Sequence, residues 1–129
     1  MSARSGGAYV ESLKKHAPCV YLGGRRVLDV TAEPVFQEPI RAIAEQYDMQ
    51  IDPAYRDVMT YPSPTTGAPV STSFLVPYTR EDLAKKRKHF KLRADHNFGF
   101  MGRAPDFMNQ FVTGWHLMAD RFARAGARF

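Results

Sequence analysis

The amino-acid sequence predicts a mainly α-helical domain with small β-hairpins, an α+β fold, and three local observations lead to this prediction. Capping residues stand before two long segments, apolar residues recur with helical spacing along the last segment, and a Gly-Gly pair separates two short β-favouring runs. The chain has 129 residues, of which 44% are hydrophobic, and this is enough for one core. We therefore expect residues 1–129 to form a single domain.

The first predicted helix begins after Ser5 and runs to Lys15. Serine is a favoured N-cap residue because its side-chain oxygen accepts a hydrogen bond from a free backbone N–H of the first turn. Tyr9 and Leu13 then lie on one apolar face, which we expect to pack against the rest of the domain.

A β-hairpin is predicted next. Residues 19–22 and 25–28 favour strands, and Gly23 and Gly24 between them accept the positive φ of a tight primed turn. We expect the Arg25-Arg26 pair to lie on an exposed strand edge and not to form a ligand site.

Two prolines precede the second predicted helix. Because proline is tolerated in a first helical turn but not deeper, we expect this helix to begin near Pro39 and not near Pro34. Its apolar face would comprise Ile40, Ile43, Ala44 and Tyr47.

Residues 61–69 are rich in Pro, Thr, Ser and Gly. This composition favours an ordered loop or wide hairpin between strands near 58–61 and 70–75.

A long basic helix follows. Thr79 and Asp82 have the spacing of a capping box, and we expect the helix to reach His96. Its packed stripe would comprise Leu83, Phe90 and Ala94.

The positive charge of the chain is concentrated on this helix, at residues 85–88 and 91–93. The whole chain has 18 Lys+Arg and 13 Asp+Glu, a net charge of +5. A basic helix can bind nucleic acid through phosphates, so a nucleic-acid-binding domain is one alternative. We favour a solvated face, because no recognised DNA- or RNA-binding motif accompanies the charge.

The last predicted helix begins at Pro105 and ends at Gly126. Its residues Phe107, Phe111, Trp115, Met118 and Phe122 form one aromatic and apolar face. Core packing is the expected role of Phe111, Met118 and Phe122. Any part of the face that stays exposed would need a missing domain or a second subunit, so a stand-alone interaction or assembly module is a further alternative.

Arg103 lies between flexible glycines and this helix start, within residues 99–109. A guanidinium stays charged at any working pH, so beside a phenol it lowers the pKa of the phenol and stabilises phenolate. On spacing alone, an ordinary helix start with a surface arginine remains the alternative.

Several segments, in this order and spacing, resemble the 4-hydroxyphenylacetate 3-monooxygenase (4-hydroxyphenylacetate 3-hydroxylase) large-component family. They are YVESL (9–13), VYLGGRRV (20–27), DVT (29–31), YDM (47–49), DVMTY (57–61), SPT (63–65), SFLVP (73–77), GFMGRAPDFMN (99–109) and TG (113–114). Members of that family are several times longer than this chain and have an acyl-CoA-dehydrogenase-like fold. The resemblance therefore implies an N-terminal helical domain only, with the middle β and C-terminal helical domains absent.

The resemblance also implies an activity, which is ortho-hydroxylation of a phenol by a two-component monooxygenase. The cofactor would be FAD, delivered as FADH2 by a separate flavin reductase, with most flavin-binding residues outside this chain. Arg103 would contact the phenolic oxygen of the substrate. The family has a tyrosine at the position of Phe107, so this chain lacks that hydroxyl. We expect the isolated chain to be inactive, because 129 residues can hardly enclose both flavin and phenol.

The remaining expectations concern partners and location. The implied partners are the reductase, a phenolic small molecule, and missing domains or further copies of the chain, with no nucleic acid and no membrane. We expect a cytoplasmic protein, because Cys19 is the single cysteine and the first residues contain no apolar signal segment. No metal site is expected, since neither Cys19 nor the spacing of the four histidines provides one.

Overall fold

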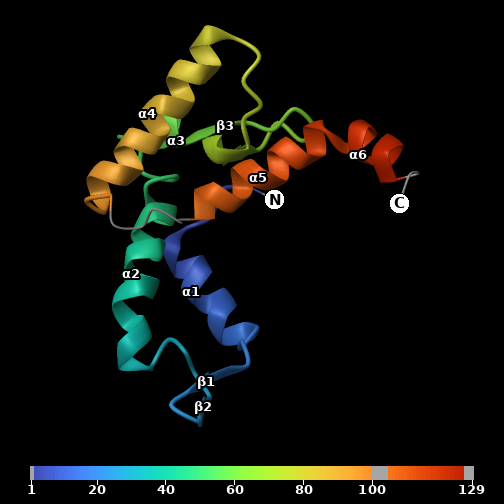
Figure 1. Cartoon of the computed structure of the whole chain (residues 1–129). Helices are drawn as coiled ribbons and strands as arrows, with labels where there is room; N and C mark the ends of the chain where they lie inside the picture. Colours follow the sequence, from blue (N-terminus) through green and yellow to red (C-terminus); the bar gives the residue numbers. More distant parts are fainter. Residues whose placement is uncertain (1, 100–104, 127–129) are drawn as a thin grey trace. The chain divides into compact units, whose positions relative to one another are not determined.

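The computed structural model describes residues 2–99 and 105–126 and is mainly helical, with two small antiparallel strand pairs (Figure 1). Its internal contacts divide the chain into two compact units, Met1–Val70 and Ser71–Phe129. Each unit has its own helices, so each is described by itself. The prediction of a mainly α fold with small hairpins is confirmed.

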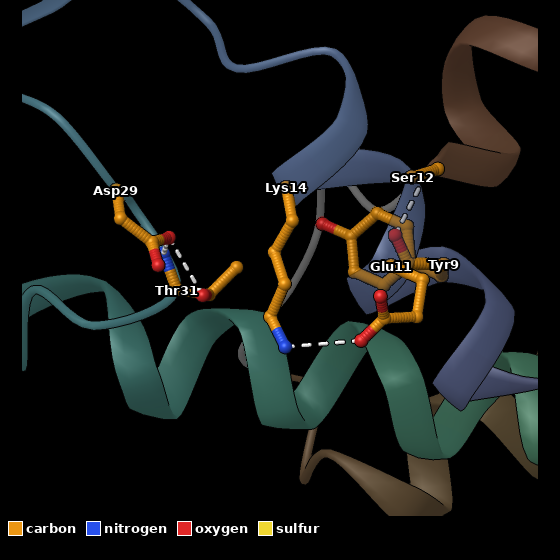
Figure 2. A network of polar contacts seen from close by, with 6 residues as sticks. All are labelled: Tyr9, Glu11, Ser12, Lys14, Asp29 and Thr31. Carbon is orange, nitrogen blue, oxygen red and sulfur yellow. Dashed lines mark hydrogen bonds and ion pairs between the residues drawn. The ribbon is translucent and has the colours of Figure 1, made fainter.

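The first unit opens with α1 (Gly6–Lys15), which begins where the sequence predicts. The side chain of Ser5 accepts a hydrogen bond of 3.1 Å from the backbone N–H of Ala8, so the predicted N-cap is present. Within the helix, the Lys14 ammonium donates to Glu11 at 3.0 Å, and this pair raises the pKa of Lys14 (Figure 2). The apolar side of α1 packs along α2.

An arginine and two tyrosines join α1 to α2. The Tyr9 and Tyr47 ring centroids lie 5.1 Å apart, and the Arg4 guanidinium carbon lies 4.8 Å from the centroid of Tyr47. Arg4 also donates a hydrogen bond of 3.3 Å to the Tyr47 hydroxyl. Burial, with a smaller contribution from Tyr47, raises the pKa of Tyr9, and the nearby Arg4 charge partly opposes this. Stacking and cation–π contact therefore fix this end of the α1–α2 pair.

The predicted hairpin is formed by β1 (Val20–Leu22) and β2 (Arg25–Val27), which pair antiparallel. Gly23 and Gly24 have φ values of 56° and 80°, as a primed turn requires. Arg25 lies on the exposed edge, as expected, where it donates to Glu33 at 2.8 Å.

The second helix, α2 (Pro34–Asp48), begins five residues earlier than predicted. Pro34 occupies the first turn, where proline is favoured, while Pro39 lies inside the helix and removes one backbone donor. Before the helix, Asp29 accepts hydrogen bonds from the backbone and side chain of Thr31, which lower the pKa of Asp29 (Figure 2). Because Pro34 and this turn fix the helix start, Pro39 does not define it.

The predicted strand near 58–61 is shorter than expected. Residues Val58 and Met59 belong to α3 (Arg56–Met59), and β3 comprises only Thr60–Pro62. Its partner is β4 (Pro69–Ser71), after which the chain turns into the 3-10 helix η1 (Thr72–Phe74). Met59, the last residue of α3, is fully buried.

The second unit is built from η1, α4, α5 and α6. Helix α4 (Arg80–His96) has the predicted capping box: Thr79 accepts from the backbone N–H of Asp82, and the Asp82 carboxylate accepts from that of Thr79. The predicted packed stripe of this helix is wrong for Leu83 and Ala94, while Phe90 is half-buried. The buried residues of the helix are His89 and Arg93, whereas Leu83 and Ala94 are exposed. Polar side chains occupy the buried face, so hydrophobic spacing could not identify it.

The last predicted helix is two helices, α5 (Pro105–Leu117) and α6 (Ala119–Gly126), which meet at Met118. The expected core packing is also wrong: Phe111 is 46% exposed, Met118 39% and Phe122 55%. The aromatic face is nevertheless continuous along α5, because the Phe111 ring centroid lies 6.0 Å from that of Trp115. Within residues 2–99 and 105–126, the structure contains no helix with the length and apolar character needed to cross a bilayer.

Candidate functional site

The candidate site is the start of α5, where the sequence places Arg103 and Phe107. Arg103 lies outside the described residues. Phe107 is in the first turn of α5, and its ring centroid lies 4.7 Å from that of Phe111, one turn further along the helix. Phe107 is 43% exposed, so its ring presents a partly open aromatic surface that carries no hydroxyl group.

The short helix η1 (Thr72–Phe74) packs against both α4 and this part of α5, and we call it the floor of the site. Thr72 and Ser73 in η1 are fully buried, and Ser71 is nearly so. The Ser71 and Ser73 hydroxyl oxygens are 2.8 Å apart, and the Ser71 oxygen also accepts from the backbone N–H of Ser73. The serines therefore satisfy one another inside the unit, as buried hydroxyl groups must.

Asn109 connects α5 to this floor. Its side-chain amide donates a hydrogen bond of 3.1 Å to the Ser73 hydroxyl oxygen. The backbone carbonyl of Asn109 accepts from the Thr113 hydroxyl at 2.7 Å, which adds a contact within the helix. The residue that holds the first turns of α5 is thus two positions from Phe107.

Lys86 of α4 holds the opposite side of η1. Its ammonium donates to the backbone carbonyls of Ser73, at 3.3 Å, and of Leu75, at 2.7 Å. One of the basic residues of α4 thus has a structural role in the unit. Lys91 is paired with Asp95 at 2.5 Å, and Arg93 is buried. The basic concentration is therefore only partly a free surface, which weighs against the nucleic-acid alternative.

A pocket of about 510 Å³ lies between α4, α5 and the segment after η1. Its lining residues are Leu75, Pro77, Leu83, Lys86, Arg87, Phe90, Gln110, Thr113, Gly114 and Leu117. Most of this lining is apolar, and the volume is within the range of small-molecule sites. The pocket is open to solvent in the described part of the chain, so these residues alone do not seal a ligand from water.

No described side chain is assigned here to flavin binding. A flavin dinucleotide needs donors for its pyrophosphate, and Lys86 at the pocket already donates to two backbone carbonyls. We therefore derive no step through flavin from these side chains. Among residues 2–99 and 105–126, no group of three or more His, Cys, Asp or Glu side chains is placed to hold a metal ion.

Comparison with known proteins identifies the family of this chain. Residues 5–129 match the family model described as 4-hydroxyphenylacetate 3-hydroxylase N terminal. The chain is 43% identical over 120 residues to the 4-hydroxyphenylacetate 3-monooxygenase oxygenase component of Thermus thermophilus, covering 93% of this chain and 24% of the relative. It is 37% identical to the oxygenase component of a Geobacillus species, covering all of this chain and 26% of the relative.

The structure is also similar to a solved oxygenase component of 4-hydroxyphenylacetate 3-monooxygenase in complex with FAD and 4-hydroxyphenylacetate. The TM-score is 0.88 with 43% sequence identity, and the match covers 93% of this chain and 25% of that chain. The described fold is therefore that of the N-terminal part of an aromatic monooxygenase oxygenase component with an acyl-CoA-dehydrogenase-like fold. The chain belongs to the 4-hydroxyphenylacetate 3-hydroxylase N-terminal family. It spans about a quarter of the length of the curated relatives it matches.

The structure brings together residues that the sequence did not connect. Asn109 and Ser73 are 36 positions apart, and both lie in segments that carry the family resemblance, yet nothing in either segment indicated that they meet. The signal in the sequence is Asn109 itself, a polar residue of α5 that does not lie on the aromatic face. It identifies a side chain that needs a hydrogen-bond partner but not which partner.

Proposed function

We propose that this chain is the N-terminal domain of a two-component, FADH2-dependent aromatic hydroxylase and contributes the Arg103 side of a phenol pocket. The observation that carries the proposal is the match of residues 5–129 to the family, together with a TM-score of 0.88 to a relative solved with FAD and 4-hydroxyphenylacetate. Further domains would supply the rest of the pocket and cover the aromatic face of α5 and α6.

In this function, Arg103 binds and polarises the substrate. A guanidinium near the phenolic oxygen favours phenolate, which raises electron density on the ring carbon ortho to that oxygen. Arg103 cannot act as a base, because it remains protonated near neutral pH. Reduced flavin, delivered by a reductase, would supply the reducing equivalents with which molecular oxygen is activated.

Phe107 would lie beside the same phenol. Its ring keeps the apolar contact that a tyrosine would make, but it cannot donate a hydrogen bond to the phenolic oxygen. We therefore expect Arg103 to carry more of the orientation of the substrate than in relatives with tyrosine at this position. We also keep a cytoplasmic location as a prediction, based on the single cysteine.

The first experiment is a titration of anaerobically reduced FAD into the purified chain, with and without 4-hydroxyphenylacetate. We expect a folded chain, checked by circular dichroism, to show no tight binding and no turnover, because an open site neither holds the cofactor nor excludes water. Tight, phenol-sensitive binding would contradict the proposal that further domains are needed.

The second experiment supplies those domains. In a graft, residues 5–129 replace the matched region of the Thermus thermophilus oxygenase component, to which this chain is 43% identical. We expect the graft to hydroxylate 4-hydroxyphenylacetate, and the Arg103→Ala variant to lose most of this activity while keeping its fold. Equal activity of the two proteins would refute the role of Arg103.

A further inference from the structure

A side-chain contact joins the first turns of α5 to η1, and this contact is separate from the residues that would touch substrate. Asn109 donates to Ser73 at 3.1 Å. Helix ends leave backbone groups unpaired and fray readily, so a side-chain bond near the start of a helix restrains it more than one in the middle.

The acceptor in this contact is itself well fixed. Ser73 is fully buried, its hydroxyl oxygen lies 2.8 Å from that of Ser71, and its carbonyl accepts from Lys86 of α4. The side chains of Asn109, Ser71 and Lys86 thus all contact this one residue of η1. Asn109 is therefore joined, through Ser73, to α4 as well as to the short helix itself.

Because Asn109 lies near the start of α5, its contact with Ser73 restrains the turn that carries Phe107. Phe107 lies two residues before Asn109, on the face where its ring meets Phe111. Any movement of the first turn relative to η1 moves the Phe107 ring with it. The Asn109 side chain lies close to this first turn. Its hydrogen bond to Ser73 joins the turn to a buried residue of η1.

We propose that Asn109 is a positioning residue, which sets where the first turn of α5 lies by bonding to Ser73 and thereby holds Phe107 at the phenol side of the site. The part that concerns the phenol rests on the proposed function. The part that concerns the helix does not.

Amide hydrogen exchange of the 129-residue chain tests the inference without any substrate. Amides from residue 109 onward carry the bonds within α5, since the first four N–H groups of a helix have no partner in it. We expect Asn109→Ala to speed exchange of these amides roughly three- to tenfold, as the loss of one hydrogen bond predicts. Alanine favours helix more than asparagine does, so faster exchange would run against helix propensity.

Two further variants separate the contact from the helix itself. Ser73→Ala leaves the sequence of α5 unchanged, and we expect it to speed exchange in the same amides by a similar factor, with little further effect in the double variant. Gln110→Ala, at a neighbouring half-buried amide residue, is the control and should leave exchange at the start of α5 unchanged. Should Asn109→Ala unfold the unit, Asn109→Leu has nearly the same shape and removes the donor.

Unchanged exchange at the start of α5 in Ser73→Ala would overturn the inference, whatever Asn109→Ala does. In the graft, Asn109→Ala should raise KM for 4-hydroxyphenylacetate roughly three- to tenfold, with a smaller effect on kcat. An active graft with unchanged KM would overturn the positioning of Phe107. A graft that is inactive with all natural side chains would count against the proposed function, and the exchange result would still decide the role of the Asn109–Ser73 bond.

Discussion

The backbone N–H of Gly6 donates a hydrogen bond of 2.7 Å to the Asp48 carboxylate, 42 residues further along the chain. This bond joins the start of α1 to the end of α2, and Gly6 is buried there. A Cβ atom at Gly6 would lie only 2.4 Å from the carbonyl oxygen of Ala44. The two helices therefore approach each other at a point where any side chain would collide with backbone.

The Gly6→Ala variant should lose about 1–3 kcal/mol of stability, because the backbone of α1 or α2 must move to admit the methyl group. Gly7→Ala is the matched control, since its Cβ would meet only the Ser5 hydroxyl oxygen at 3.8 Å. That variant should gain about 0.5–1 kcal/mol from helix propensity. Urea unfolding followed by circular dichroism measures both, and equal stability of the two variants would contradict the close approach.

Pro39 is expected to weaken α2. It lies inside the helix, where it removes a backbone donor that would otherwise bond to the Val35 carbonyl. Pro39→Ala should therefore stabilise the chain by about 1–2 kcal/mol, the helical gain being reduced by the greater freedom of the unfolded chain. Pro34→Ala should give no gain, because proline is favoured in the first turn. A thermal melt of the two variants tests this, and a destabilised Pro39→Ala would show that the ring makes a contact worth more than the bond.

The capping box of α4 should make this helix sensitive to acid. Backbone hydrogen bonds from Thr79 and Tyr78 hold the pKa of the Asp82 carboxyl below its ordinary value of 3.8. Because the folded-state pKa is lowered, the contribution of Asp82 is fully present above pH 3.8 and is lost as the pH falls through the folded-state value. An NMR titration of the carboxyl group from pH 6 to pH 2 should show this lowered pKa.

Thr79→Ala removes the other half of the box and should cost about 1 kcal/mol. In this variant the pKa of Asp82 should move back toward 3.8. Glu81→Gln, also in the first turn, is the control and should leave the titration of Asp82 in place. An unchanged Asp82 pKa in Thr79→Ala would mean that the geometry of the cap does not depend on the threonine side chain.

The Phe107→Tyr variant tests the phenol side of the proposed site. Because Phe107 is 43% exposed, a hydroxyl group can be added with a change in stability of less than about 0.5 kcal/mol. In the graft, we expect kcat/KM for 4-hydroxyphenylacetate to rise roughly 10- to 150-fold, since a hydrogen bond to a charged oxygen is worth about 1.5–3 kcal/mol. Phe111→Tyr adds the same group one turn away and should leave kcat/KM unchanged; equal gains in both variants would refute the assignment.

Trp115 reports on the aromatic face of α5, because it is the sole tryptophan of the chain and is 56% exposed. In the isolated chain we expect its fluorescence to be quenched readily by acrylamide. In the graft, further domains should cover the face, shift the emission to shorter wavelength and protect the indole. Protection that appears in the isolated chain as its concentration rises would favour self-association, and thus the interaction-module alternative.

Local signals made much of the fold predictable. Ser5, Thr79 and the Gly23-Gly24 pair act on residues at most a few positions away, so their structures follow from the sequence around them. The predicted start of α2 is wrong because it rests on Pro39, whereas Pro34 is the proline in the first turn. Which of the two prolines begins the helix depends on the preceding turn and on packing, and the general preference of proline for the first turn does not include either.

The buried face of α4 and the site were harder to predict for a different reason. His89 and Arg93 are buried although their side chains are polar, so the rule that apolar residues lie inside selected Leu83 instead. The Asn109–Ser73 bond joins segments far apart in the sequence, and only the packing of η1 brings them together. Family resemblance identifies the position of Phe107, but its contact with Phe111 follows from the helical geometry of α5.

The hairpin of β1 and β2 lies within the stretch of chain that α1 and α2 must close when they meet. Each of its residue pairs is close in sequence, from Leu22 with Arg25 to Val20 with Val27, so it can form on its own in an early folding event. Once formed, it shortens the flexible chain between the two helices and lowers the entropy lost on closing the loop. The turn glycines should therefore make closure of the first unit modestly easier, in addition to setting the local twist of the strands.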